Sequence, residues 1–316
     1  MKKNYKNLKV VVSGGDGFIG SHLVKTLIDL GAELYCVIEP GMDLWRVKEI
    51  EDKINIIECD ICGPGLRTEI KKINPDKAFH LASLVNASRD MSLLDDMLRV
   101  NVSGAMNFML ALKDTDCEAI VNTGTCEEYG DNKAPFREKD LPSPVSPYSA
   151  SKAAATFYCG MLYRSFKMPI VTARPFLTYG PGQVNNMFIP SLIESALRGH
   201  DFEMTKGDQT REFNYVSDIV DGFIRLGSNS RAIGRIINIG CGKDYRIIDL
   251  AEKIVSMAGS GIRLKTGKLS YRPGEVSRFY CDNTLARKLL GWKPRVSLDE
   301  GLRRTIEWWK KRIYSN

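Results

Sequence analysis

The sequence predicts an α/β protein whose core is a doubly wound parallel sheet, followed by a smaller C-terminal α/β portion. Short apolar runs of β-branched character alternate with helical patterns up to about residue 175, and a glycine-rich turn follows the first run. Strands joined by helices lie parallel in one sheet and gather ligands at their carboxyl ends. The expected strands span 8–13, 33–38, 54–58, 77–82, 118–123 and 169–174.

The first strand leads directly into the turn Gly14-Gly15-Asp16-Gly17-Phe18-Ile19-Gly20, and residues 21–30 then follow a helical pattern. Glycines at these spacings allow a tight turn, a bare backbone beneath a pyrophosphate and close packing of the helix on the strand. The amino terminus of the helix supplies hydrogen-bond donors for the phosphates. We therefore expect a dinucleotide bound to a Rossmann-type sheet, with contacts from Gly14, Gly17, Phe18, Ile19 and Gly20.

Acidic residues follow the second and third strands. Glu39 comes after strand 33–38, where its carboxylate can accept hydrogen bonds from both hydroxyls of an adenosine ribose and would repel a ribose phosphate. We therefore expect NAD rather than NADP as the cofactor, although Arg46 would weaken this preference if its loop folded back. Asp60, beside Ile61 after the third strand, is placed to accept a hydrogen bond from the adenine amino group.

Cys59 and Cys62 flank this aspartate with a Cys-x-x-Cys spacing. No second pair and no suitable histidine accompany them, so two incidental thiols are favoured over a metal or redox site. We expect no metal in the protein, because the chain has only three histidines.

Tyr148 and Lys152 are spaced one helical turn apart. Ser146 and Pro147 suit the cap and the first position of a helix, which places the tyrosine in the first turn and the lysine on the same face. Free tyrosine titrates near pKa ~10, and a nearby cation and a helix amino terminus both lower this pKa. A tyrosine tuned in this way can remove a proton from a sugar hydroxyl during hydride transfer. The spacing is weak evidence alone, but after a dinucleotide-binding turn it indicates a catalytic pair.

The composition is ordinary for a globular enzyme, and 316 residues give room for one large or two modest domains. We expect an NAD-binding domain at 1–175 and a mainly substrate-binding portion at 176–316, some segments of which return to the sheet. The net charge of +7 is spread along the chain, which fits a solvated surface and an anionic small substrate. The absence of a basic block or reader motif argues against nucleic acid binding.

Three features bear on the location of the protein. No run of about 18 apolar residues exists, so no membrane span is expected. The basic start leads straight into a core strand and lacks the apolar stretch of a secretory signal. Eight scattered cysteines in a nucleotide-binding fold indicate a reducing compartment rather than disulfides. Together these features predict a cytoplasmic protein.

Over nearly its whole length the chain resembles the extended short-chain dehydrogenase/reductase superfamily, in its NAD-dependent nucleotide-sugar epimerase/dehydratase branch. The motifs that carry the resemblance are Gly14-x-x-Gly17-x-x-Gly20, Asp60, His80-Leu81-Ala82-Ser83, Asn101-Val-Ser-Gly104, Thr125 with Tyr129-Gly130, Tyr148-x-x-x-Lys152, Arg174 with Tyr179-Gly180-Pro181, Arg211-Glu-Phe-Asn-Tyr-Val-Ser-Asp218 and Arg272-Pro-Gly-Glu275. The order of these motifs along the chain is specific to this branch, but members of the branch that share it catalyse different reactions. The resemblance implies a nucleotide diphosphate sugar as substrate.

The resemblance also implies roles for individual residues. Thr125, Tyr148 and Lys152 are the implied catalytic trio, in which the lysine also holds the nicotinamide ribose. Arg211 and Arg272 look like the residues that grip the nucleotide diphosphate, because guanidinium binds phosphate oxygens in a fork. The remaining implied roles are cofactor contacts for Leu81, Ala82 and Ser83, substrate contacts for Thr125 and Cys126, and a structural role for His80.

Members of this family pair two helices of each subunit in a four-helix bundle, which implies a homodimer. The matching segments are 93–112 and 149–165. Both carry apolar residues beyond what one core-facing stripe needs, for example Met97, Met106, Phe108, Met109, Phe157, Tyr158 and Met161. The alternative is that these side chains simply fill the core.

Two departures from the family pattern bear on the reaction. Leu177 stands where family members commonly have asparagine, which removes an expected polar contact to the substrate. Glu127 matches the carboxylate of the family's sugar 4,6-dehydratases, whereas Cys126 replaces their intervening Asp or Ser. Some decarboxylases of UDP-glucuronate share this carboxylate.

A nucleotide-sugar 4,6-dehydratase is the leading hypothesis, because that reaction needs a carboxylate such as Glu127 to remove the C5 proton after C4 is oxidised. A 4-epimerase needs only Tyr148, Thr125 and rotation of the ketosugar, and Leu177 is compatible with a pocket in which the sugar turns. A 4-ketoreductase and a decarboxylase stay open as further alternatives. The intact catalytic trio argues against a non-enzymatic NAD-binding sensor.

Overall fold

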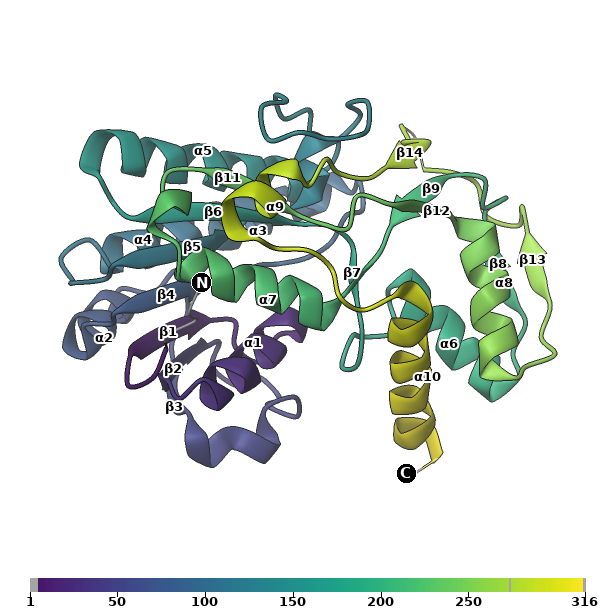
Figure 1. Ribbon diagram of the computed structural model, residues 1–316, viewed down its shortest axis with the longest axis horizontal. Coiled ribbons are helices and arrows are strands. Elements are labelled where there is room, and N and C mark those ends of the chain that lie inside the picture. Colours follow the sequence, from purple (N-terminus) through teal and green to yellow (C-terminus); the bar gives the residue numbers. More distant parts are fainter. Residues whose placement is uncertain (1–4, 273, 315–316) are drawn as a thin grey trace.

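The computed structural model describes residues 5–272 and 274–314, and it confirms the doubly wound parallel sheet (Figure 1). The sheet has seven strands in the order β11-β6-β5-β4-β1-β2-β3, all paired in parallel. Their bounds are β1 (Lys9–Ser13), β2 (Glu33–Ile38), β3 (Asn55–Glu58), β4 (Lys77–His80), β5 (Ala119–Thr123), β6 (Ile170–Pro175) and β11 (Ile236–Ile239). All six predicted strands are present, and β11 comes from the second half of the chain. Residues 1–4 of the basic start and Pro273 of the Arg272-Pro-Gly-Glu275 motif lie outside the described residues.

Helices cover both faces of this sheet. α1 (Phe18–Asp29) and α7 (Val216–Gly227) pack on one face, and α2 (Gly65–Ile73), α4 (Ala105–Ala111) and α5 (Pro147–Phe166) pack on the other. Along β1, Val10 and Val12 enter the first layer and Val11 enters the second, so all three side chains are buried. Burial on both faces explains why the strands read as continuous apolar runs.

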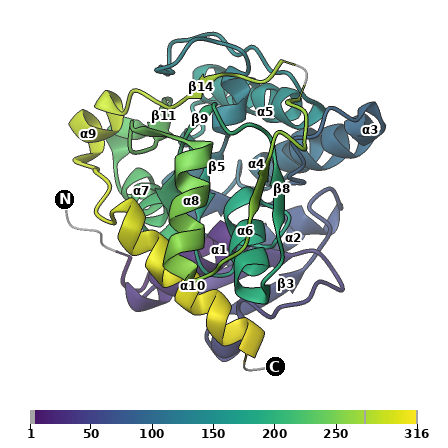
Figure 2. The ribbon, with the colours of Figure 1, turned by 90° about the vertical axis from the view of Figure 1, so that its right-hand side faces the viewer.

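Most of the remaining elements form the part of the molecule at the right of Figure 1. Figure 2 shows its helices α6 (Phe188–Arg198), α8 (Ile247–Ala258) and α10 (Leu298–Tyr314). Short strands accompany them: β8 (Phe202–Met204) with β13 (Leu264–Thr266), β7 (Thr178–Tyr179) with β10 (Asn214–Tyr215), and β9 (Thr210–Glu212) between β12 (Asp244–Arg246) and β14 (Arg278–Phe279). α9 (Thr284–Leu290) lies beside α7 and β11. None of the helices in the described part of the chain has the length and apolar character needed to cross a membrane.

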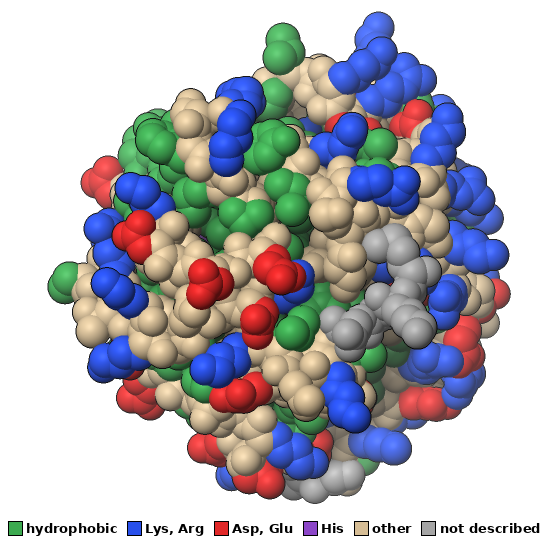
Figure 3. Space-filling view, turned by 60° about the vertical axis from the view of Figure 1, so that its left-hand side comes forward, with side chains coloured by type: hydrophobic (Ala, Val, Ile, Leu, Met, Phe, Trp, Pro, Cys, Tyr) green, Lys and Arg blue, Asp and Glu red, His purple; other side chains and the backbone are tan. Residues whose placement is uncertain are grey.

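One surface over α5 is apolar, and it continues over α3 (Leu94–Met97) and a π-helical segment (Leu98–Gly104) that runs into α4. Hydrophobic side chains gather there, at the upper left of Figure 3, and Phe157 and Tyr158 are 57% and 48% exposed. The structure corrects the expectation for three other residues assigned to a subunit contact. Met97, Phe108 and Met109 are buried in the protein's own interior, because the helical period turns them inward.

Candidate active site

The glycine-rich turn joins β1 to α1 at the carboxyl end of the sheet. Gly14 has a φ of +70°, and a β-carbon on it would lie 2.7 Å from the amide nitrogen of Ala82. A β-carbon on Gly20 would lie 2.0 Å from the carbonyl oxygen of Gly14, so α1 approaches the turn very closely. α1 begins at Phe18 with no side-chain cap and no acidic residue in its first turn, which leaves its amide groups open to an anion. The turn therefore fits the pyrophosphate of a dinucleotide.

Two carboxylates follow the neighbouring strands β2 and β3, where the adenosine of a dinucleotide is expected. Glu39 is exposed. Asp60 accepts hydrogen bonds from the Cys62 amide at 2.8 Å and from the Arg99 guanidinium at 3.3 Å, which fix its direction. Burial raises the pKa of the Cys59 and Cys62 thiols, and the charges of both carboxylates raise it further, so the thiols stay protonated. Within residues 5–272 and 274–314, no three His, Cys, Asp or Glu side chains gather as metal ligands would.

The loop after β2 folds back on the glycine-rich turn. Arg46 donates hydrogen bonds to the carbonyl oxygens of Asp16, at 3.3 Å, and of Gly182, at 2.9 Å. The ring of His22 on α1 lies 2.8 Å from the carbonyl oxygen of Pro181, in the same loop as Gly182. The loop that carries Arg46 therefore does fold back, which was the condition for a weaker preference for NAD over NADP. The Arg46 guanidinium is, however, already hydrogen-bonded to two carbonyl oxygens.

Thr125 and Tyr148 meet beyond the carboxyl end of β5. Thr125 caps a short 3-10 helix, η4 (Cys126–Tyr129), and its hydroxyl accepts a hydrogen bond from the Glu127 amide at 3.2 Å. α5 begins at Pro147 behind the predicted Ser146 cap, which puts Tyr148 in its first turn. The Thr125 and Tyr148 side chains are both buried.

The electrostatics of the Tyr148 phenol differ from the sequence-based expectation. Burial raises the pKa of Tyr148, hydrogen bonding with Thr125 lowers it, and the negative charges of Glu127 and Glu128 raise it. The expected lowering of this pKa is therefore wrong for the protein alone, because desolvation of the phenolate outweighs the favourable contact. An ionised Tyr148 needs further positive charge close to its oxygen.

Lys152 lies one turn further along α5 and is 3% exposed. Burial lowers the pKa of Lys152 to about 8, whereas Glu128 and Cys159 raise it. His80, at the end of β4, has its Nδ1 2.7 Å from the Ser13 hydroxyl, and burial lowers its pKa to about 3. A neutral, fully buried His80 fits the structural role expected for it.

Glu127 is half-buried among charged groups that come from distant parts of the chain. Burial raises the pKa of its carboxyl, Arg211 and Arg272 lower it, Glu275 raises it, and Arg89 lowers it. Glu127 therefore lies close enough to Arg211 and Arg272, the two arginines assigned to the diphosphate, for their charges to lower its pKa. Arg211 donates to the Glu275 carboxylate and to two backbone carbonyls at 2.7 and 2.8 Å, whereas Arg272 is exposed.

Cys126 and Leu177, which depart from the family pattern, share one small apolar cluster with four buried aromatic residues, Tyr129, Phe136, Phe176 and Phe279. Cys126 is 2% exposed, and burial raises the pKa of its thiol well above the usual range. Leu177 packs against the edge of the cluster. Apolar packing therefore replaces the polar group that family members commonly have at position 177.

Glu128 is the site residue that the sequence analysis missed. Its buried carboxylate accepts a hydrogen bond from the Thr125 amide at 2.8 Å and two from Arg174, at 2.9 and 2.7 Å. Thr125-x-x-Glu128 is a capping box, in which the fourth residue returns to the amide of the cap, so a local signal was present in the sequence. The sequence does not show that Arg174, on β6, closes on the same carboxylate from another side.

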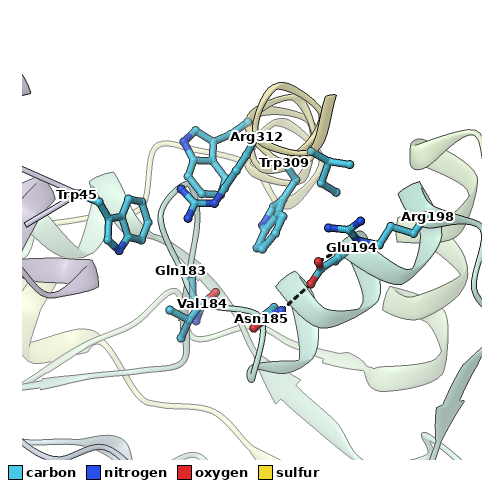
Figure 4. A pocket seen from close by; sticks show the side chains of 10 residues that line it. Trp45, Gln183, Val184, Asn185, Glu194, Arg198, Trp309 and Arg312 are labelled. Carbon is cyan, nitrogen blue, oxygen red and sulfur yellow. Dashed lines mark hydrogen bonds and ion pairs between the residues drawn. The ribbon is translucent and has the colours of Figure 1, made fainter. Parts of the chain in front are cut away.

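A cavity of about 230 Å³ lies apart from these residues, between the loop after β2 and helices α6 and α10 (Figure 4). Its walls include Trp45, Asn185, Glu194, Trp309 and Arg312, and none of the predicted site residues. Glu194 accepts a hydrogen bond from Asn185 at 2.7 Å, which a dashed line marks in Figure 4. The cavity is therefore separate from the Thr125–Tyr148 contact.

The chain is similar to known proteins over nearly its whole length. Residues 11–305 match the family model described as GDP-mannose 4,6 dehydratase. The dTDP-D-glucose 4,6-dehydratase of Mus musculus is 28% identical over 325 residues, which cover 97% of this chain and 90% of that protein.

Solved structures give the same fold. An epimerase from Methanothermobacter thermautotrophicus superposes with a TM-score of 0.91 at 29% identity, covering 98% of this chain and 94% of that one. The UDP-glucuronic acid 4-epimerase of Bacillus cereus, solved with UDP-glucuronic acid and NAD, has a TM-score of 0.88 at 26% identity, with coverages of 97% and 100%. Similar proteins thus include dehydratases and epimerases, so similarity alone does not select a reaction.

Proposed function

Because the chain belongs to the GDP-mannose 4,6-dehydratase family, within the extended short-chain dehydrogenases/reductases, we propose that it is a nucleotide-sugar 4,6-dehydratase. The family acts on nucleotide sugars with NAD, and this chain is an NAD-dependent nucleotide-sugar enzyme. The observation that carries the proposed reaction is the place of Glu127, whose amide donates a hydrogen bond to the Thr125 hydroxyl at 3.2 Å and whose charge raises the pKa of Tyr148. Burial raises the pKa of the Glu127 carboxyl, which makes its carboxylate a stronger base than an exposed one.

The first stage concerns the sugar C4 hydroxyl. Tyr148 removes the hydroxyl proton, and the Thr125 hydroxyl holds the same oxygen by a hydrogen bond. NAD, when bound, supplies the hydride acceptor and later the hydride donor. Lys152 holds the nicotinamide ribose, and its charge favours the Tyr148 phenolate that burial alone disfavours.

Glu127 acts in the second stage. A carbonyl at C4 acidifies the C5 hydrogen, so Glu127 removes this proton while the C6 hydroxyl takes up a proton and leaves as water. Hydride then enters at C6 and a proton enters at C5. The sugar loses one water in total, and its oxidation and reduction cancel.

The proposed cofactor contacts follow the carboxyl edge of the sheet. The glycine-rich turn holds the pyrophosphate, Glu39 the adenosine ribose, and Asp60 the adenine. The full proposed set is Gly14, Gly17, Phe18, Ile19, Gly20, Glu39, Asp60, Ile61, Leu81, Ala82, Ser83, Tyr148 and Lys152. The open amides of α1 and the space at the glycines support this arrangement.

For the substrate, we assign the diphosphate to Arg211 and Arg272, and the sugar pocket to Thr125 and Cys126. In this structure the Glu275 carboxylate engages Arg211. The diphosphate would share this guanidinium with Glu275 or replace the Glu275 carboxylate on it.

A 4-epimerase is the second candidate. Leu177 offers packing rather than a polar group to fix the sugar, and both similar solved structures described above are epimerases. In that reaction no C5 proton moves, and Glu127 has no catalytic role.

The test is to incubate the purified protein with a panel of nucleotide diphosphate sugars and measure product masses. Loss of one water supports dehydration. An isomer of unchanged mass indicates epimerisation, loss of carbon dioxide indicates decarboxylation, and gain of two hydrogens indicates ketoreduction. A protein that binds NAD and converts none of the sugars would instead support the NAD-binding sensor.

We further propose a homodimer formed through the segments 93–112 and 149–165, supported by the apolar face in Figure 3. A cytoplasmic location is supported by the eight cysteines, which are all free thiols in the described part of the chain. For the domains we propose an NAD-binding part, 1–175, and a mainly sugar-binding part, 176–316, from which β11 joins the sheet as an edge strand and α7 packs on it.

A further inference from the structure

Glu128 is a buried carboxylate that joins three elements of the candidate active site. Its Oε1 accepts hydrogen bonds from the Thr125 amide before η4, at 2.8 Å, and from the Thr156 hydroxyl on α5, at 3.1 Å. Its Oε2 accepts from Nε and Nη2 of Arg174 on β6, at 2.9 and 2.7 Å. Glu128 and Arg174 are 0% and 1% exposed, so solvent does not screen this ion pair.

The partners of Glu128 stand beside residues proposed for the chemistry. Thr156 follows Lys152 by one turn of α5. The carboxylate also fills the space under the turn that carries Thr125, because a β-carbon on Gly124 would lie 2.4 Å from its Oε1. Displacement of Glu128 would therefore move Thr125 relative to α5.

We infer that Glu128 and Arg174 form a positioning pair that fixes Thr125 against α5 and places a negative charge beside Lys152. The pair acts through these neighbours and has no assigned contact with substrate. It works as a unit, because either charge would be strongly disfavoured in the interior without the other. The inference rests on the roles proposed above for Thr125 and Lys152.

The charges around Lys152 make this inference testable. Burial lowers the pKa of Lys152 to about 8, and Glu128 from η4 raises it. Cys159 on α5 has its pKa raised to about 12 by burial, and His80 at the end of β4 has its pKa lowered to about 3, so both are neutral near pH 8. Arg174 on β6 balances Glu128 from the other side. Glu128 is thus the anionic neighbour that favours a charged Lys152.

The direction of the pH effect follows from this arrangement. Lys152 holds the nicotinamide ribose as an ammonium, so NAD affinity should fall as the pH rises through the lysine pKa of about 8. Glu128→Gln removes a negative charge that raises this pKa. In the variant, NAD affinity should therefore fall at a lower pH.

The experiment is calorimetric titration of NAD into the sugar-free protein over a range of pH, followed by kinetics with a sugar that is turned over. In Glu128→Gln the midpoint of the affinity loss should move down by about one pH unit. Its kcat should fall about tenfold to a hundredfold through misplacement of Thr125, with KM for the sugar within about threefold.

Glu138→Gln is the matched control. The Glu138 carboxyl is also partly buried with a raised pKa, and it accepts a hydrogen bond from the Asn238 amide at 3.1 Å. It acts on Arg174 electrostatically, and within the described residues it has no hydrogen bond to Thr125 or Thr156. This variant should keep the wild-type midpoint and kcat.

A second variant guards against simple misfolding. Glu128→Gln leaves a guanidinium buried without its partner, whereas Glu128→Gln/Arg174→Gln removes both charges. The double variant should fold, by circular dichroism and thermal melting, and still show the lower midpoint. An unchanged midpoint in folded variants, an equal shift in Glu138→Gln, or failure of both variants to fold would overturn the positioning role. A wild-type protein that does not bind NAD would instead contradict the proposed function.

Discussion

Gly20 packs its Cα directly against the carbonyl oxygen of Gly14, so that a β-carbon on Gly20 would lie only 2.0 Å from that oxygen. The contact is backbone against backbone, and no flexible side chain can move aside. Gly20→Ala should therefore push α1 away from the turn. We expect a loss of about 2 kcal/mol or more in the free energy of unfolding, together with loss of measurable NAD binding.

Urea unfolding and NAD titration check this expectation. Gly65→Ala is a matched control, because Gly65 begins α2 and a β-carbon there would meet nothing within 4 Å. It should leave NAD binding unchanged and stability equal or higher by up to about 1 kcal/mol. Normal NAD binding by Gly20→Ala would contradict the close approach of helix and turn.

Local sequence patterns were sufficient for most of the sheet and for the start of α5. Strand 33–38 is observed at Glu33–Ile38, and Ser146 caps α5 with Pro147 in its first turn. These features depend on residues that are adjacent in the chain, so periodicity and capping preferences predict them.

Contacts between distant segments could not be predicted in this way. Arg174 reaches Glu128, and Arg211 reaches Glu275, only because the fold brings separate strands and loops together. The pKa of Tyr148 depends on how deeply α5 and its neighbours bury the phenol, which no local pattern shows. The number of apolar residues on a helix likewise does not show which of them are buried in the core and which are exposed, as Phe108 and Phe157 illustrate.

Glu39→Ala should narrow the preference for NAD over NADP, mostly by weakening NAD binding. The carboxylate is expected to accept hydrogen bonds from both ribose hydroxyls, so its loss should cost about tenfold to a hundredfold in NAD affinity. Calorimetry with both cofactors measures the change. Glu33→Ala, at the other end of β2, should leave both affinities unchanged. If the wild-type protein binds NADP at least as tightly as NAD, the assignment of Glu39 is wrong.

Tyr148→Phe should lower turnover by about 10²-fold to 10⁴-fold, because only the ionisable oxygen is removed. NAD affinity should stay within about threefold, since the variant keeps all the other proposed cofactor contacts. Lys152→Ala should impair both turnover and NAD binding, in line with its two proposed roles. Initial rates and NAD titrations separate these effects, with Tyr163→Phe on the same helix as control. An active Tyr148→Phe enzyme would show that another group removes the proton.

Sedimentation velocity should show the wild-type protein as a dimer at assay concentrations. Phe157, 57% exposed on α5, lies in the proposed contact, and Phe157→Glu should yield monomers because it would bury an unpaired charge there. Leu141→Glu is the control, since Leu141 is 80% exposed in the loop before α5 and should not affect association. A monomeric wild-type protein would reject the proposed helix bundle.

Glu127→Gln tests the choice of reaction. In a dehydratase the variant should still oxidise C4, so reduced nicotinamide should accumulate on the enzyme, while product formation falls by at least about 10²-fold for want of a base. In an epimerase, product formation should stay within about threefold of the wild type, because Glu127 moves no proton there. Absorbance of the reduced cofactor and product analysis measure the two steps separately.

Running the reaction in D₂O gives an independent test of whether the enzyme is a dehydratase or an epimerase. Dehydration breaks the C5–H bond and later adds a proton at C5, so product formed in D₂O should carry deuterium there. A 4-epimerase breaks only the C4–H bond and returns the same hydride, so its product should carry no carbon-bound deuterium. Deuterium-free product, made by Glu127→Gln at the normal rate, would assign the chain to the epimerases and leave Glu127 without a catalytic role.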